Sequence, residues 1–332
     1  MPTSNLIPGN YPVVYSNGIG FYHAKYKCQA PGLVTGRSGT IGKFTLIPEG
    51  YYWPHNTTLW VTDFMGNDPL FVDYLYQTIH FENYMMGSGV PTLNRNTIHN
   101  QHVFIPSSNE QRAIATYFRH LDSLIETADK KLASLKQVKE ASLQSMFPKE
   151  GQKVPEVRFK GFEGEWKELS FNNLFSLVSD YKSNIGNKTD YQEEGKYPII
   201  DQSKEYIVGY TNEDNPIIPD NGIIVFGDHT REIKYIDFPF YTGADGTKLL
   251  HCQQSVFPLF GYYSCCSQRI PNTGYNRHYK YLKEADYIIP SLPEQRAIAT
   301  YFVHLDKQIA IAQQRLDLLR RIKSACLDEM FV

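Results

Sequence analysis

The sequence lacks long apolar runs. Its first ten residues, MPTSNLIPGN, contain no basic start and no apolar core, and no stretch approaches the ~18 consecutive apolar residues of a membrane helix. Neither a secretory signal nor a membrane anchor is therefore expected. We predict a soluble, cytoplasmic protein with no membrane partner.

Cysteine is scarce and unpatterned. The five residues, Cys28, Cys252, Cys265, Cys266 and Cys326, form no C-x-x-C pair and have no flanking histidine at zinc-finger spacing. Structural zinc sites need thiolate and imidazole ligands at such spacings. The sequence therefore predicts free thiols and no metal site.

Motifs of nucleotide and methyl-donor enzymes are also missing. The loop GRSGTIGK (36–43) resembles a phosphate-binding loop only superficially, because Arg37 and Phe44 stand where glycine and Ser/Thr are required. The stretch DNPII shares only Asn215 and Pro216 with the [DN]-P-P-[YF] motif of adenine methyltransferases. We predict no catalytic residues and no cofactor.

The chain has no excess of positive charge. Its 33 Lys and Arg residues are outnumbered by 35 Asp and Glu, which gives a net charge of −2. Nucleic-acid binding would therefore depend on local clusters of basic and polar side chains, since bulk attraction to phosphate is absent.

An internal repeat is present instead. EQRAIATYF occupies residues 110–118 and again 294–302, and twelve of the thirteen positions from Glu110 to Asp122 are identical 184 residues later. In each copy the apolar positions are spaced alternately by four and three residues, which is typical of a coiled-coil seam. The seam positions are Ile114, Phe118, Leu121, Ile125, Ala128, Leu132, Leu135, Lys139, Ser142 and Met146, and then Ile298, Phe302, Leu305, Ile309, Ala312, Leu316, Leu319, Lys323, Cys326 and Met330. Two matched seams predict two long helices, the first from about residue 109 to 146, that pair with each other.

A region of different character precedes each helix. Both regions are rich in Tyr, Phe, Gly and Pro and contain short β-prone runs, such as GLVTG (32–36) and GIIVFG (222–227), bounded by turns. We interpret each as a mixed α/β domain, with a helix at 68–79 in the first. The second begins with an entry segment, 157–180, that the first lacks. Either the first domain is short, or the chain begins inside a longer ancestor.

These features resemble a known family. P-x-x-x-E-Q-R-x-I-A opens both helices, GEW opens the second domain, and PTLN or GYN comes near the end of a domain. The chain resembles the specificity (S) subunit of type I restriction-modification systems. The resemblance implies an α+β fold in which two mixed α/β target recognition domains are separated by two long helices that form an antiparallel coiled coil. It divides the chain into a first recognition domain (1–106), a first spacer helix (107–149), a second recognition domain (150–290) and a second spacer helix (291–332).

The resemblance also implies a function. Each recognition domain would read one half of a split, asymmetric site in double-stranded DNA, and the helix pair would set the gap. Two methyltransferase (M) subunits would dock on the helices, restriction-translocation (R) subunits would join them, and the chain itself would have no catalytic activity. Two identical partners would explain why the helices are alike, and two different half-sites would explain why the domains differ.

Candidate DNA contacts are polar and basic residues in loops, since base edges are read by such side chains. In the first domain they are Arg37, Ser38, Thr40, Lys43, Asn94 and Arg95, and in the second His229, Thr230, Arg231, Lys234, Lys248, Tyr275, Asn276 and Arg277. Surface hairpins and helix-entry loops would contain such residues too. Candidate partner-docking residues are the repeated triplets Glu110, Gln111, Arg112 and Glu294, Gln295, Arg296, although the glutamates also suit the positive end of a helix dipole.

Two other interpretations remain. The doubled coiled coil could organise an adaptor whose domains bind peptide or sugar without any role for DNA. Alternatively, Asp228, His229 and Glu232 could form a metal-nuclease cluster, although three residues in so short a stretch share no enforced face. A bipartite DNA motif with a fixed gap would favour the S-subunit interpretation over both.

Overall fold

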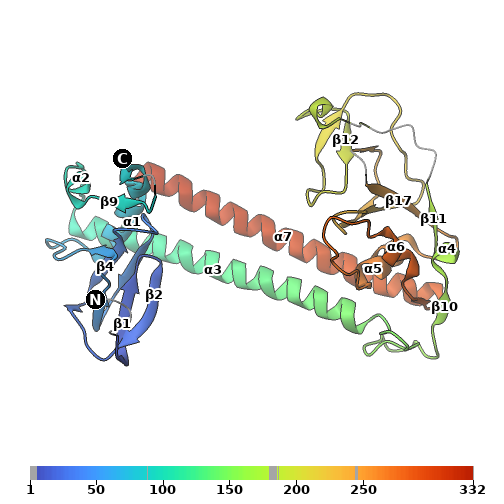
Figure 1. Ribbon diagram of the computed structural model, residues 1–332, viewed down its shortest axis with the longest axis horizontal. Helices are drawn as coiled ribbons and strands as arrows, with labels where there is room; N and C mark the ends of the chain where they lie inside the picture. The colour runs from blue at the N-terminus through green and yellow to red at the C-terminus, as the bar shows by residue number, and fades with distance from the viewer. Residues whose placement is uncertain (1–5, 88, 179–184, 186, 244–245, 332) are drawn as a thin grey trace. The chain divides into compact units, whose positions relative to one another are not determined.

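The computed structural model describes residues 6–87, 89–178, 185, 187–243 and 246–331, and the chain forms two compact units (Figure 1). The first unit comprises Met1–Lys131 with Ala312–Val332, and the second comprises Leu132–Ile311. Each unit therefore contains one sheet-rich domain together with one end of each long helix.

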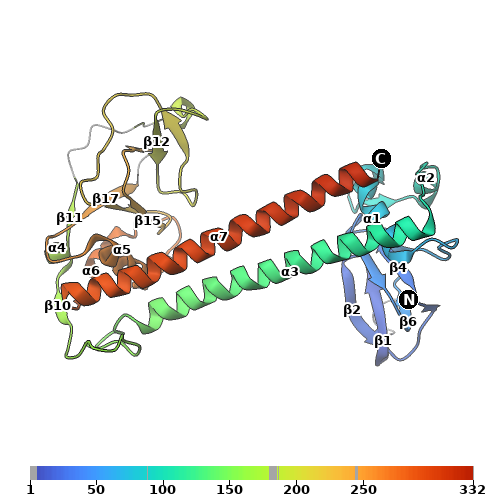
Figure 2. The ribbon, with the colours of Figure 1, turned by 180° about the vertical axis from the view of Figure 1, so that it is seen from behind.

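The first domain contains two main sheets, and its strands β1, β2 and β6 are best seen in Figure 2. One sheet has the order β2-β1-β6-β3, with β1 antiparallel to β2 and parallel to β6, and the other has the order β5-β4-β7. The strands are β1 (Pro8–Tyr15), β2 (Gly18–His23), β3 (Cys28–Gln29), β4 (Gly32–Gly36), β5 (Phe44–Ile47), β6 (Tyr51–Pro54), β7 (Thr58–Trp60), and the hairpin β8 (Met85–Met86) with β9 (Thr92–Leu93). The helices are α1 (Pro69–Thr78), the 3-10 helix η2 (Phe81–Tyr84) and α2 (Arg95–His99).

The second domain repeats this plan with additions. Its sheets have the orders β11-β17-β14-β15, β13-β12-β16 and β10-β18. The strands are β10 (Lys167–Leu169), β11 (Phe175–Leu177), β12 (Tyr197–Ile200), β13 (Gly209–Thr211), β14 (Ile223–Gly227), β15 (Ile233–Ile236), β16 (Tyr241–Thr242), β17 (Thr247–Cys252) and β18 (Tyr287–Ile289). The helices are α4 (Phe171–Leu174), η3 (Lys188–Asp190), α5 (Pro258–Ser267) and α6 (Tyr279–Glu284). The last two residues of the entry segment, 179 and 180, lie outside the described residues.

The central strands follow directly from their sequences. Every residue of β4 and of β14 is buried, because each strand lies between two neighbours and is covered on both faces. A strand that is buried on both faces has a nearly continuous run of apolar residues in its sequence. The expected strands at 32–36 and 222–227 and the expected helix at 68–79 are thereby confirmed.

The two long helices are α3 (Ser108–Ser145) and α7 (Leu292–Met330). In the first unit the start of α3 lies beside the end of α7, since Lys323 Nζ is 2.6 Å from Asp122 Oδ1. In the second unit the end of α3 lies beside the start of α7, since Lys139 Nζ is 2.6 Å from Asp306 Oδ1. Both contacts require antiparallel helices, so the expected pairing is confirmed.

Each domain is attached to its helices by equivalent contacts. The hydroxyl of Tyr74, on α1, donates to Asp122 Oδ2 at 2.7 Å, and that of Tyr263, on α5, donates to Asp306 Oδ2 at 2.8 Å. The seam lysines complete the arrangement, because Lys323 Nζ lies over the ring of Tyr74 and Lys139 Nζ over the ring of Tyr263. The polar residue in each seam is thus explained by a tyrosine–aspartate–lysine cluster in which the tyrosine is buried and the two charged side chains are partly exposed.

An acidic residue of α1 provides a test of the packing in the first unit. Burial raises the pKa of Asp73 from 3.8 to about 6, against the opposing effects of Gln77 and Lys323. Because the folded pKa lies above the unfolded one, the first unit is most stable below pH 3.8 with respect to this group and loses stability as pH rises through about 6. Asp73→Asn is therefore expected to remove that pH dependence and to stabilise the unit at pH 7 by about 2 kcal/mol. Chemical denaturation of both proteins at pH 5 and pH 7 measures this, and an unchanged difference between the two pH values contradicts it.

The described residues contain no helix that is both long and apolar enough to cross a membrane. Within the same ranges, no group of three His, Cys, Asp or Glu side chains is placed to hold a metal ion, and the five cysteines are free thiols. Burial raises the pKa of the Cys252 and Cys266 thiols to about 12, so both are protonated and unreactive at neutral pH.

Candidate nucleic-acid interface

Three segments meet at one end of the first domain. In the loop that joins β4 to β5, the carbonyl of Arg37 accepts a hydrogen bond from Leu93 N at 2.8 Å. The backbone N–H of Arg37 donates to the carbonyl of Thr57, also at 2.8 Å. An isolated bridge pairs Ser38 with Thr92. The structure therefore brings the predicted contacts in the loop 37–43 next to those at 94–95.

Most predicted side chains of this surface are exposed. Arg37, Thr40, Lys43 and Arg95 are open to solvent, while Ser38 is half-buried. Lys43 Nζ donates to the carbonyl of Asn17 at 2.8 Å. Asn94 is also exposed, but its side-chain oxygen accepts from Asn96 N at 3.0 Å and caps α2. Helix capping is therefore one role of the Asn94 side chain.

The second domain brings corresponding loops together. His278 N donates to the carbonyl of Asp228 at 2.7 Å, which joins the loop after β14 to the loop before α6. The rings of His229 and Tyr275 are stacked, with centroids 4.6 Å apart and planes at 8°. Tyr275 remains 87% exposed, and Asn276 and Arg277 are exposed beside it. One face of this aromatic pair is therefore available to a flat ligand such as a base.

In each domain a glycine lies where the loop leaves the central strand, Gly36 in the first and Gly227 in the second. A Cβ atom on Gly36 would lie 2.0 Å from the carbonyl oxygen of Thr40, and one on Gly227 would lie 2.2 Å from Thr230 Oγ1. The loop therefore folds back against the end of the central strand in both domains. No larger residue fits there unless the loop moves.

Four predicted contacts of the second domain are partly or wholly engaged within the domain. Lys234 is buried, and its ammonium donates to the carbonyls of Asp201 and Glu205 at 2.8 and 2.5 Å, so it lies outside the exposed surface. Burial lowers the pKa of Lys234 against the raising effect of nearby carboxylates. Thr230 donates to the carbonyl of Gln202, and Arg231 Nη1 donates to that of Ile270 at 3.2 Å. Lys248 Nζ lies 6.0 Å from the centre of the Tyr279 ring.

Sequence reasoning missed a further segment of each surface. In the second domain Gln202 Oε1 accepts from His229 N at 3.1 Å, so the loop after β12 supports the loop after β14. In the first domain the turn between β1 and β2 has the same place, since Asn17 accepts from Lys43 and Ser16 lies beside Gly39. The polar turn YSNG between two β-prone runs was the available signal.

The repeated Glu-Gln-Arg triplets are only partly exposed. Gln111 is buried and bonds Asp68 N, Asn67 Oδ1 and Pro106 O, and Gln295 likewise bonds Phe257 N, Ser255 O and Pro290 O. Each glutamine therefore fastens its long helix to the segment that leads into α1 or α5. Arg112 and Arg296 are exposed. Glu294 is buried, whereas Glu110 is exposed, so only part of each triplet can meet a partner.

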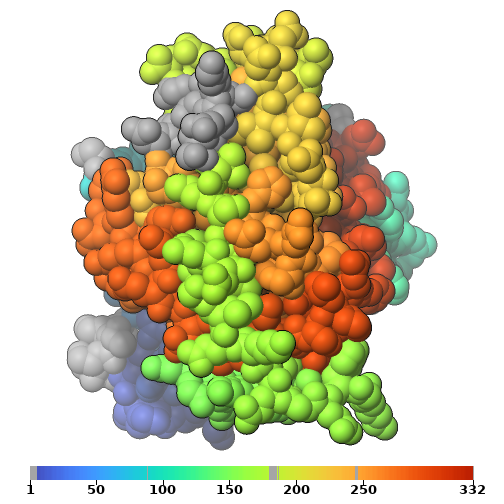
Figure 3. Space-filling view, turned by 90° about the vertical axis from the view of Figure 1, so that its right-hand side faces the viewer, coloured from blue at the N-terminus to red at the C-terminus, as the bar shows by residue number. Residues whose placement is uncertain are grey.

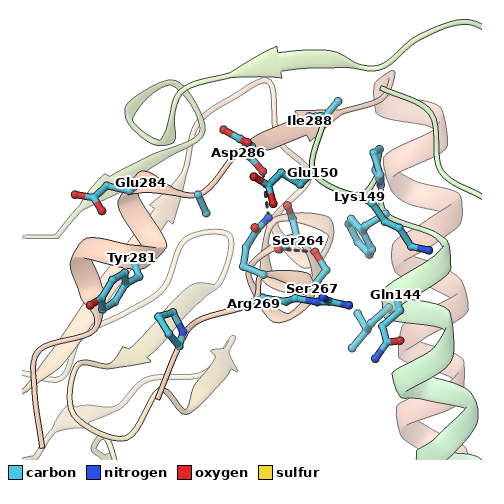
Figure 4. A pocket seen from close by; sticks show the side chains of 16 residues that line it. Gln144, Lys149, Glu150, Ser264, Ser267, Arg269, Tyr281, Glu284, Asp286 and Ile288 are labelled. Carbon is cyan, nitrogen blue, oxygen red and sulfur yellow. Dashed lines mark hydrogen bonds between the residues drawn. The ribbon is translucent and has the colours of Figure 1, made fainter. Parts of the chain in front are cut away.

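The cluster suggested for nuclease chemistry is used structurally. Asp228 is buried, and its Oδ1 accepts from Tyr279 N at 2.8 Å at the start of α6. A cavity of about 490 Å³ lies elsewhere, between the end of α3 and the helices α5 and α6. Figure 4 shows basic residues, Lys149 and Arg269, and acidic ones, Glu150 and Asp286, around it. This mixture of charges singles out no substrate.

Comparison with known proteins identifies the family. The model of the type I restriction modification DNA specificity domain matches residues 5–137 and 163–321. The chain belongs to this family. The two matches contain the loop surfaces of both domains described above, that of the first domain in residues 5–137 and that of the second in 163–321. No curated protein matches the sequence.

Solved structures agree on the fold. The chain is similar to the S subunit of a type I restriction-modification system from M. genitalium, at 16% identity and a TM-score of 0.68, covering 100% of this chain and 91% of that one. It is also similar to a chain from a study of complex assembly and conformational transition in a type I system, at 14% identity and a TM-score of 0.56. That match covers 99% of this chain and 92% of the other. The predicted family and α+β fold are confirmed.

Proposed function

We propose that each domain reads one half of a bipartite DNA site through the loops gathered at its end. The observation that carries this proposal is the matching pair of surfaces, built in each domain from the loop after the central strand and the segment before a short helix, α2 in the first domain and α6 in the second. The surfaces expose different side chains, with Arg37 and Arg95 in one and Tyr275, Asn276 and Arg277 in the other. Arginine and asparagine form the most specific contacts with base edges, so different sets would read different sequences.

The buried or internally bonded candidates have a supporting role in this proposal. Lys234, Thr230 and Arg231 hold the loop 228–232 against neighbouring carbonyls and thereby position His229. The exposed residues are then the ones that contact DNA. This division follows from the fact that a side chain already bonded inside the domain gains little by turning to a base.

The long helices provide a repeated surface for methyltransferase subunits in the same proposal. Three exposed residues are identical in both copies and lie four residues apart along the helix: Arg112, Thr116 and His120, with Arg296, Thr300 and His304. Residues at this spacing share one face of a helix. Packing inside the units does not demand their identity, whereas two copies of one partner would. Restriction-translocation subunits would join the complex formed in this way, and the methyl transfer would take place in the methyltransferase subunits.

Selection of duplex DNA tests the proposal. The chain is purified with its methyltransferase subunits and used to select from randomised duplexes at fixed salt. Two short half-sites separated by a fixed gap are expected, because two rigid surfaces on one chain must be matched together. Binding that falls steeply with salt and shows no sequence preference would contradict DNA reading. A complex that forms but binds no DNA would favour an adaptor.

A further inference from the structure

The loop surface of the second domain contains a stacked aromatic pair. Tyr275 stacks on His229, with ring centroids 4.6 Å apart and planes at 8°. His229 is the second residue after the glycine that ends the central strand, and the residue at the same place in the first domain is Ser38. Ser38 forms an isolated bridge with Thr92 instead. The pair formed by Tyr275 and His229 is therefore a feature of the second surface.

The loop that carries Tyr275 is anchored at its base by a buried histidine. His278 is 0% exposed, and its Nδ1 donates to the carbonyl of Asp228 at 3.0 Å. Because a carbonyl oxygen can only accept, Nδ1 carries the hydrogen, and Nε2 accepts from Thr273 N at 3.3 Å. The two ends of the segment 273–278 are thereby held together, on either side of the tyrosine.

The tip of this loop is closed by hydrogen bonds of its own. Asn272 Oδ1 accepts from Gly274 N at 3.1 Å, and Asn276 N donates to the carbonyl of Gly274 at 2.8 Å. Gly274 has a φ of 78°, which glycine adopts without strain, so the chain turns just before Tyr275. Tyr275 is nevertheless 87% exposed. Figure 3 shows orange residues from this part of the chain on the surface of the second domain.

The open face of the aromatic pair restricts what it can bind in DNA. Within a duplex the neighbouring base pairs cover both faces of a base, and only the base edges are open in the grooves. Edges are read by hydrogen-bonding groups, such as those of the exposed residues Asn276 and Arg277. The face of an aromatic ring stacks on a base that has left the helical stack, as it does in proteins that bind single strands.

We propose that Tyr275 and His229 form a stacking platform for one unpaired base of the second half-site. The inference rests on the proposed function, in which the second domain reads duplex DNA. Such a base arises in the proposed complex, because methyltransferases turn their target nucleotide out of the duplex and leave its partner unpaired. Tyr275 stacks on the base, His229 supports the ring from behind, and Asn276 and Arg277 contact the edge of the base.

Duplexes with one abasic nucleotide test the platform. The chain in complex with its methyltransferase subunits is titrated with the duplex that it selects, and each nucleotide of the second half-site is replaced in turn by an abasic analogue. Opposite the platform base we expect affinity to rise about tenfold, because that base no longer has to be unpaired before it stacks. Elsewhere affinity is expected to fall or to stay unchanged, since each replacement removes a base edge.

Variants at Tyr275 assign this gain to the aromatic ring. Tyr275→Leu is expected to bind the intact duplex about tenfold more weakly and to lose the gain from the abasic nucleotide, because stacking is lost. Tyr275→Phe retains the ring and is expected to behave as the native chain does. Tyr22→Leu is the matched control, since Tyr22 is exposed on β2, outside the loops. Both tyrosines are exposed, so these variants leave the fold intact, which circular dichroism verifies.

The position of the gain identifies the base. Transfer of labelled methyl groups maps the methylated nucleotide in the same duplex. A gain at that nucleotide, lost in Tyr275→Leu, assigns the platform to the base paired with it. A gain at another nucleotide, equally dependent on Tyr275, assigns the platform to a base that the second domain itself unpairs. Either result supports stacking on an unpaired base.

Other results overturn the platform. A scan in which no position binds more tightly, or a gain that survives in Tyr275→Leu, means that no base stacks on the tyrosine. If replacing one thymine by uracil weakens the native complex as much as Tyr275→Leu does, the ring contacts a thymine methyl group within the intact duplex. Selection and affinity that are unchanged in Tyr275→Leu overturn the platform alone. A native complex that selects no sequence overturns the proposed function and the platform with it.

Discussion

Replacement of Arg37 by alanine is expected to relax sequence preference in one half of the DNA target and to leave the other half unchanged. Arg37 is exposed on the loop after β4, and Arg277 is exposed on the corresponding surface of the second domain. An arginine that contacts a guanine discriminates against other bases by about 1–3 kcal/mol, or roughly 10–100-fold. Arg277→Ala is therefore expected to relax the other half by a similar factor. Selection from duplexes randomised in one half at a time measures both effects.

A matched control comes from the repeat itself. Arg119 is exposed on α3 and is the one residue between Glu110 and Asp122 that differs from its counterpart, Val303. Arg119→Val removes the same charge as Arg37→Ala but lies on α3, outside the loops that we propose to read DNA, so neither half-site is expected to change. If Arg37→Ala weakens both halves equally and lowers the salt dependence of binding, its contact is with phosphate and carries no sequence information.

The long helices were predictable because their pattern is both periodic and repeated. The spacing of Ile114, Phe118 and Leu121 reports a buried stripe, and these residues are indeed buried against α1 or α7. The same is true of Ile298 and Phe302 in the second copy. Local periodicity is sufficient here, since a helix that buries one face must repeat apolar residues every three or four positions.

Individual polar residues were less predictable, and the repeated glutamines show why. Their identity in the two repeats placed Gln111 and Gln295 in a predicted docking surface, but both side chains are buried and bonded to main-chain groups about forty residues away. Lys234 is a similar case, since its partners are two carbonyls in the loop after β12. Such contacts depend on how distant segments meet, and no local pattern in the sequence encodes them.

One difference between the two domains, the entry segment of the second, was visible in the sequence. The entry segment was recognised as a segment of the second domain that the first lacks, yet its roles were not visible. Only the pairing of β10 with β18 and of β11 with β17 shows that it fills two edges for which the described residues of the first domain supply no strand. An internal repeat is thus most informative at the positions where the two domains have different structures.

The second large effect is expected at the ion pair between Arg158 and Glu294. Arg158→Met should lower the unfolding free energy of the second unit by about 3 kcal/mol, because removal of one partner leaves a buried charge without compensation. Glu294 is 2% exposed and Arg158 15%, so the pair is largely shielded from water. Hydrogen exchange resolved by segment is the appropriate measurement, since a chain with two units need not unfold in a single transition. Faster exchange is expected in β10 and β18, which the same segment holds together.

Two further variants separate charge from packing. Arg158→Met combined with Glu294→Met is expected to regain most of the lost stability, because a buried ion pair can be replaced by apolar side chains at little cost. Glu110→Gln, at the equivalent exposed position, is expected to change stability by less than about 0.5 kcal/mol. A large loss from Glu110→Gln would mean that the first unit already neutralises this carboxylate. The contrast between a paired, buried carboxylate at Glu294 and an exposed one at Glu110 would then be wrong.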